Sequence, residues 1–163
     1  MNPLLFLGRE FLNKMTGPDV PAEEREAYRD SLAVYSGSED GAATPALLIR
    51  SFNDLKTDEY EGFTPDAMLW FVDWIASQEN PELTGVLRPE VFQSIFTAFE
   101  EPHVRLRVVE VGVQWEEARG VQPESSILRS IYEIAGEDRD LVLDALRLDG
   151  GEYARSVMYR LGA

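Results

Sequence analysis

Side chains that commonly carry out catalysis or bind metals are scarce in this chain of 163 residues. Cysteine is absent and His103 is the only histidine, so one chain can form neither a thiol nucleophile nor a site with several histidine ligands. Carboxylates are plentiful, but their spacing singles out no catalytic pair, and the acidic loop from Asp58 lacks the glycine and ligand spacing of a calcium loop. We therefore expect a protein that is not an enzyme, with no catalytic residues, no metal site and no cofactor. An enzyme that uses carboxylates and arginines is kept as a third alternative.

The most distinctive stretch is residues 58–86, which contains seven acidic residues and no lysine or arginine. It also contains the densest group of aromatic residues in the chain. On a helical wheel, most of residues 64–80 are apolar, and a helix that is apolar on nearly all sides is usually buried. We therefore expect this segment to be the central core helix, with Phe71, Val72 and Ile75 as packing residues.

The acidic residues of the same stretch are candidates for a binding surface. On the wheel, Asp66 and Asp73 share one narrow stripe with Trp70 at its edge. Aromatic side chains within a charged rim are the usual arrangement of a protein-binding hot spot, although most charged runs are simply solvated. The predicted partner-binding residues are Asp58, Glu59, Tyr60, Glu61, Asp66, Trp70, Asp73, Glu79 and Glu82.

The net charge of −15 narrows the choice of partner. It disfavours direct binding to nucleic acid and docking on an anionic membrane, because both need a basic surface. It favours a basic protein partner, although salt adaptation or solubility alone would also explain the acidity. No apolar run approaches the roughly 18 residues of a membrane span, and the N-terminus lacks the features of a signal peptide. With no cysteine, these features lead us to expect a cytoplasmic protein.

Two functions follow from these features. The first is a non-enzymatic acidic protein that binds a basic partner protein through residues 54–82, in the manner of an inhibitor, an immunity protein or a DNA mimic. The second is a helical structural or adaptor subunit of a larger assembly, such as a phage particle. In that case the apolar segment from Leu4 to Phe11 would dock on a neighbouring copy, forming a homo-oligomer, or on another protein.

Helical periodicity runs through most of the chain, and we expect an all-α fold in a single domain covering residues 1–163. The pattern predicts about eight or nine short helices, and the segments after residue 88 suggest stacked antiparallel pairs, although they do not align as repeats. Residues 36–45 are small, polar and glycine-containing, which predicts a flexible loop.

Local signals predict where several helices begin and end. Thr44 and Thr64 each precede a proline, a combination that caps and starts a helix, and Gly136 is placed to end one. Residues 103–115 are ambiguous, because their valines fit both the alternation of a strand and the stripe of a helix. We expect a helix there because no second segment offers a partner strand, and a strand is the alternative.

Overall fold

The computed structural model describes residues 9–17, 21–24, 49–78 and 84–162, and these residues are mainly helical, with no strand among them. The predicted all-α fold is therefore confirmed. The α-helices are α1 (Arg9–Met15), α4 (Pro65–Ser77), α6 (Glu90–Ala98), α7 (Pro102–Ala118), α8 (Ile127–Ile134), α9 (Arg139–Asp149) and α10 (Glu152–Arg160). The 3-10 helices are η2 (Thr57–Gly62), η3 (Pro123–Ser125) and η4 (Gly136–Asp138). The predicted loop at residues 36–45 and the helix start at Thr44 lie outside the described residues.

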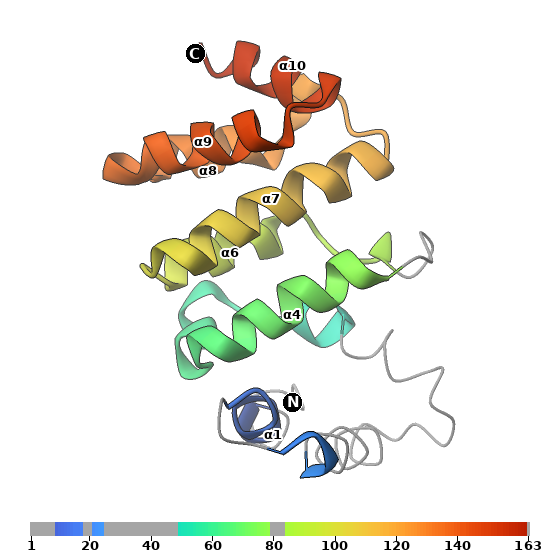
Figure 1. Ribbon diagram of the computed structural model, residues 1–163, viewed down its shortest axis with the longest axis vertical. Coiled ribbons are helices and arrows are strands. Elements are labelled where there is room, and N and C mark those ends of the chain that lie inside the picture. The colour runs from blue at the N-terminus through green and yellow to red at the C-terminus, as the bar shows by residue number, and fades with distance from the viewer. Residues whose placement is uncertain (1–8, 18–20, 25–48, 79–83, 163) are drawn as a thin grey trace.

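The helices are stacked in layers along the long axis of the molecule (Figure 1). From α1 upward, the layers are α4, then α6 with α7, then α8 with α9, and finally α10. Contacts follow the same order, since α1 packs on α4, α4 on α7, α7 on α9 and α9 on α10. One continuous core runs through the stack, from Leu12 of α1 to Val157 of α10.

The helix α7 lies at the centre of this stack and contacts α4, α6, α8, α9 and α10. It begins at Pro102, whose fixed φ suits the first helical position, directly after the extended residue Glu101. Its valines disfavour a helix only weakly, and burial on several sides outweighs that preference. The strand alternative for residues 103–115 is therefore wrong. The buried residues of α7 are Val104, Val108, Val109, Val111, Gly112, Val113, Trp115 and Glu116.

The helix α4 is buried on one face only. It starts as predicted: the Thr64 hydroxyl accepts a hydrogen bond from the Ala67 amide at 3.1 Å, and Pro65 follows. The predicted packing residues are confirmed, since Phe71 and Val72 are each 1% exposed and Ile75 is 3% exposed. The opposite side of α4, with Asp66, Asp73 and Ser77, is exposed, so the prediction that nearly all of this helix is buried is wrong.

Arg105 of α7 joins three elements through its guanidinium group. Its Nε donates to the carbonyls of Phe96 and Phe99 at 3.0 and 2.7 Å, and its Nη1 pairs with the Asp138 carboxylate at 2.6 Å. The two carbonyls lie at the end of α6, where backbone acceptors lack helical partners and a positive charge is favourable. This side chain, which is 15% exposed, therefore fastens α6 and η4 to α7.

Two isoleucine truncations should change the free energy of unfolding to different extents. Ile75→Ala removes a side chain that is 3% exposed, and the cavity should cost about 2–5 kcal/mol. Ile134→Ala removes one that is 48% exposed, and should cost about 1 kcal/mol or less. Urea denaturation followed by circular dichroism compares the two variants, and equal losses would show that α4 is not part of the core.

Two glycine substitutions should act in opposite directions. Gly112 lies inside α7, and an added Cβ would meet Leu128 and Phe92 at 3.8 Å, an ordinary contact distance. Gly112→Ala should therefore stabilise the protein by about 0.5–1 kcal/mol, because alanine loses less backbone freedom in a helix. Gly150 ends α9 with a φ of 66°, so Gly150→Ala should cost about 1 kcal/mol. Thermal unfolding midpoints check the signs, and two shifts of the same sign would contradict the different roles assigned to these glycines.

Candidate functional site

The acidic segment before α4 is held in place by contacts from two other parts of the chain. Asn13 of α1 donates to the Gly62 carbonyl at 3.0 Å and accepts from the Thr64 amide at 2.9 Å. The helix η2 also packs on α6, where the hydroxyl oxygens of Thr57 and Ser94 lie 3.3 Å apart. The segment that the sequence suggests as an exposed loop is therefore an ordered 3-10 helix.

The residues of η2 differ in what they offer a partner. Asp58 and Glu61 are exposed, as is Asp66 in the first turn of α4. Among the described residues, none of these three carboxylates forms an ion pair. Glu59 is partly buried. Its carboxylate accepts a hydrogen bond from the Lys56 amide at 2.8 Å, so its first role is to cap the start of η2.

Tyr60 is a core residue and not a surface contact. Its side chain is 1% exposed, and its hydroxyl donates to the Phe52 carbonyl at 2.8 Å. Burial is the main reason that its pKa is raised, with the charge of Glu59 adding to the effect. The prediction that Tyr60 contacts a partner is therefore wrong, because alternation of acidic and aromatic residues cannot show which side chains a short 3-10 helix turns inward.

The outer face of α4 brings together acidic and aromatic side chains. Asp66, Trp70, Asp73 and Ser77 follow one another at helical spacing, and the three polar residues are exposed. The Trp70 ring is half-buried and stacks on Trp74, with ring centroids 6.2 Å apart and planes at 12°. This stripe agrees with the helical wheel of the sequence.

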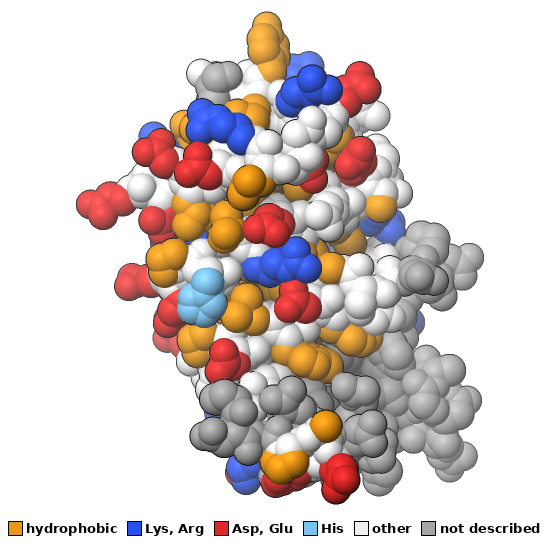
Figure 2. Space-filling model, in the orientation of Figure 1, with side chains coloured by type: hydrophobic (Ala, Val, Ile, Leu, Met, Phe, Trp, Pro, Cys, Tyr) orange, Lys and Arg blue, Asp and Glu red, His pale blue; other side chains and the backbone are white. Residues whose placement is uncertain are grey.

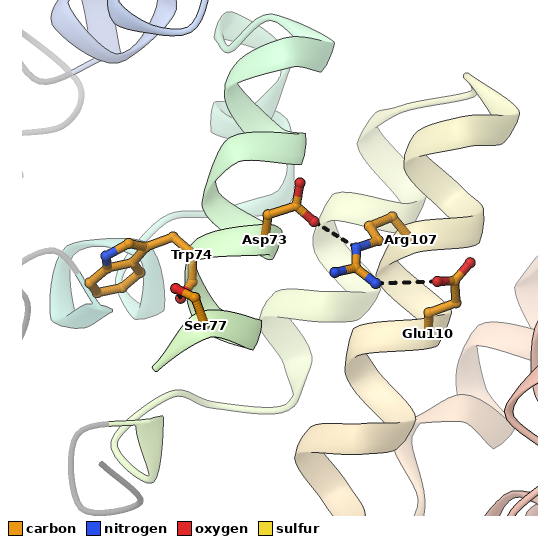
Figure 3. Close-up of polar contacts among 5 residues, drawn as sticks. All are labelled: Asp73, Trp74, Ser77, Arg107 and Glu110. Carbon is orange, nitrogen blue, oxygen red and sulfur yellow. Dashed lines mark hydrogen bonds and ion pairs between the residues drawn. The ribbon is translucent and has the colours of Figure 1, made fainter. Parts of the chain in front are cut away.

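Asp73 is occupied by an arginine of the neighbouring helix. Figure 3 shows Asp73 pointing toward Arg107 of α7, whereas Trp74 points to the other side of α4. The Arg107 Nε donates to the Asp73 carboxylate at 2.6 Å, and its Nη1 donates to Glu110 at 3.2 Å. The hydrogen bond to Asp73 is the main reason that the pKa of Arg107 is raised. Asp73 therefore offers less charge to a partner than Asp58 or Asp66 does.

Glu79 and Glu82, the last two predicted partner-binding residues, lie outside the described residues. His103 is exposed in the first turn of α7. In the part of the chain that the structure describes, no group of three or more His, Asp or Glu residues could hold a metal ion. Nor does any described helix have the length and apolar content to cross a membrane.

One polar cluster was not found from the sequence. Glu116 of α7 is 1% exposed, and its carboxylate accepts from the Ser126 hydroxyl at 2.6 Å and the Ile127 amide at 3.1 Å. Burial raises the pKa of Glu116, and these two hydrogen bonds oppose that effect. The sequence does indicate that Glu116 is buried, because Glu116 follows Val109 and Gly112 at the spacing of one helix face.

A shallow hollow of about 670 Å³ is lined by residues of η3 and α10, which also contact each other. Its charged lining is mixed, with Arg155 and Arg160 beside Glu124 and Glu152. The wider surface is also mixed: on the face shown in Figure 2, acidic side chains alternate with arginines and hydrophobic groups. The hollow therefore favours neither an anionic nor a cationic ligand, and η2 with α4 is the better candidate site.

Comparison with known proteins identifies no relative, since no family model, no curated protein and no solved structure matches the chain.

Proposed function

We propose that this protein is a non-enzymatic binding protein that recognises a basic segment of a partner protein. The proposed contact, called the acidic surface below, consists of Asp58, Glu61, Asp66 and Trp70. The observation that carries the proposal is the combination of three exposed carboxylates with a partly buried indole on an ordered backbone. It supports protein binding because hot spots combine an aromatic centre with a polar rim.

The charge of the acidic surface would act mainly before contact is made. Exposed carboxylates without ion pairs attract a basic partner over about 8 Å at physiological salt, which speeds encounter more than it stabilises the complex. Because Asn13 and α6 already hold η2 in place, binding would not have to order this segment. Such prior ordering lowers the entropic cost of association.

The Trp70–Trp74 pair would supply the short-range part of the contact. A tryptophan that is half-buried offers apolar area and a ring face on which an arginine or lysine can lie. The chain itself uses this contact, since the Arg119 guanidinium lies 5.4 Å from the ring of Trp115 and that of Arg139 lies 5.1 Å from Tyr132. A partner rich in arginine fits these groups.

One narrower form of this function is inhibition of a protein that binds nucleic acid. A site shaped for phosphates presents arginines and lysines, and a row of fixed carboxylates can occupy such a site as a mimic of the phosphates. The net charge of −15 is consistent with this form.

The second candidate is a helical adaptor or assembly subunit, favoured by one observation at the other end of the stack. Leu148 of α9 is 75% exposed and Tyr159 of α10 is 81% exposed, and these are the most exposed large hydrophobic side chains in the part of the chain that the structure describes. The N-terminal apolar segment from Leu4 to Phe11 was the predicted docking element for this function. Residues 4–8 lie outside the described residues, so the α9–α10 end provides the better test.

Charge reversal on the acidic surface should abolish capture of the partner. Asp58→Lys with Glu61→Lys changes two exposed residues, and Glu117→Lys with Glu133→Lys is a control with the same change in net charge at two other exposed positions. Pull-downs at low salt, read by mass spectrometry, should recover a basic protein with the wild type and the control but not with the first variant. Equal recovery by all three proteins would show that the acidic surface is not the contact.

Truncation of an aromatic side chain should separate the two candidate functions. Trp70→Ala should raise the dissociation rate of the captured partner about tenfold or more, if this ring is a hot spot. Tyr159→Ala removes an aromatic side chain at the opposite end, and should leave that rate unchanged. Surface plasmon resonance measures both rates, on variants first shown to be folded by circular dichroism. An effect confined to Tyr159→Ala would favour the adaptor function.

A further inference from the structure

Glu116 is the only buried aspartate or glutamate among the residues that the structure describes. Its carboxylate has two hydrogen-bond donors, the Ser126 hydroxyl at 2.6 Å and the Ile127 amide at 3.1 Å. A buried carboxylate is costly when it is ionised, and a hydroxyl and one amide compensate this cost less well than a paired cation would. The site therefore favours the neutral carboxyl group.

The cluster around Glu116 connects three helices. Ser126 is the N-cap of α8, because its hydroxyl also accepts from the Leu128 amide at 3.1 Å. Tyr153 of α10 adds a third polar group: its hydroxyl oxygen is buried and has no hydrogen-bond partner among the described residues. Burial is the main reason that the pKa of Tyr153 is raised and the charge of Glu116 adds to it, whereas the neighbouring Ser126 hydroxyl opposes the rise. Glu116, Ser126 and Tyr153 are called the Glu116 cluster below.

Other charged groups on the elements around the cluster are exposed or occupied elsewhere. On α7, Glu117 is exposed and Arg119 lies over the Trp115 ring. On η3, Glu124 pairs with Arg160 of α10 at 3.8 Å. Further charged residues on these helices are Arg129 of α8, Asp144, Arg147 and Asp149 of α9, and Glu152 and Arg155 of α10, all exposed except Asp149, which is partly buried. Of these, Asp144 pairs with Arg147 at 3.1 Å, and Asp149 accepts from the Gly151 amide at 3.1 Å.

We propose that the Glu116 cluster is a pH-sensitive contact that holds α8 and α10 against the end of α7 when Glu116 is neutral and loosens them when Glu116 is ionised. A neutral carboxyl group removes the cost of the buried charge and provides an O–H donor. In the same cluster the buried Tyr153 hydroxyl oxygen forms no hydrogen bond of ordinary geometry with a described residue and can accept this proton. An ionised Glu116 has no proton to donate and regains water only if the helices around it separate.

The direction of the pH dependence follows from the burial of Glu116. Folding raises the pKa of this group above its unfolded value, so its stabilising contribution is complete below the unfolded pKa. That contribution is lost as the pH rises through the folded pKa. Each unit of difference between the two pKa values changes the equilibrium for opening by about tenfold.

Hydrogen exchange of the whole chain tests the proposal. Amide exchange would be followed by mass spectrometry from about pH 4 to about pH 8 and corrected for the intrinsic pH dependence of exchange. In the wild type, opening of α8 and α10 should increase by about tenfold for each unit of pKa difference, with little change in α4. Glu116→Gln cannot ionise and should remove this increase. Glu117→Gln, an equal change at the adjacent exposed residue, should retain it.

Two results would overturn the proposal. The first is an increase in opening that Glu116→Gln leaves as large as in the wild type. The second comes from titrating the carboxyl carbons of the wild type by nuclear magnetic resonance. This measurement needs no variant, so it tests the proposal even if Glu116→Gln does not fold. A pKa for Glu116 that is equal to or below that of Glu117 would show that the neutral form is not favoured.

Discussion

The packing of this molecule depends on one helix, α7, that is buried along much of its length by five neighbouring helices. It lies between α4 and α9 and contacts α6, α8 and α10 as well. Valines and a glycine make up much of its buried surface. A Cβ added at Gly112 would lie 3.8 Å from the side chains of Phe92 and Leu128. The residues of α7 that are buried between the layers are mostly valines, and Glu116 is the one charged residue among them.

Much of the fold could be predicted because the signals for it are local. The hydroxyl of Thr64, the proline after it, and Gly136 with its φ of 55° act within a few residues of their own positions. The helix expected at the valine-rich segment 103–115 is confirmed, but the pattern left a strand open, because a strand and a buried helix differ there only in the neighbours they contact. Those neighbours come from segments far away in the chain.

In the candidate site, too, single side chains could not be predicted where their contacts come from distant parts of the chain. The stripe of α4 could be predicted from helical spacing, and Asp66 is exposed as expected. The ion-pair partner of Asp73 could not be predicted from the sequence. Arg107 lies 34 residues away and meets Asp73 only because α4 packs on α7. The prediction that Tyr60 contacts a partner was wrong for a related reason. Its hydroxyl donates to the backbone carbonyl of Phe52, which lies in another helical segment.

The two hydrogen bonds of Asn13 have a consequence for both candidate functions. They join α1 to the backbone on either side of Phe63, at the junction of η2 and α4. A ligand that drew α1 away from the stack would therefore remove one support of η2, while buried Tyr60 and the packing on α6 would remain. By thermodynamic reciprocity, a ligand that binds the carboxylates of η2 in their ordered arrangement would strengthen the attachment of α1. Binding at the N-terminal helix and binding at the acidic surface would then affect each other's affinity, with Asn13 as the connection between them.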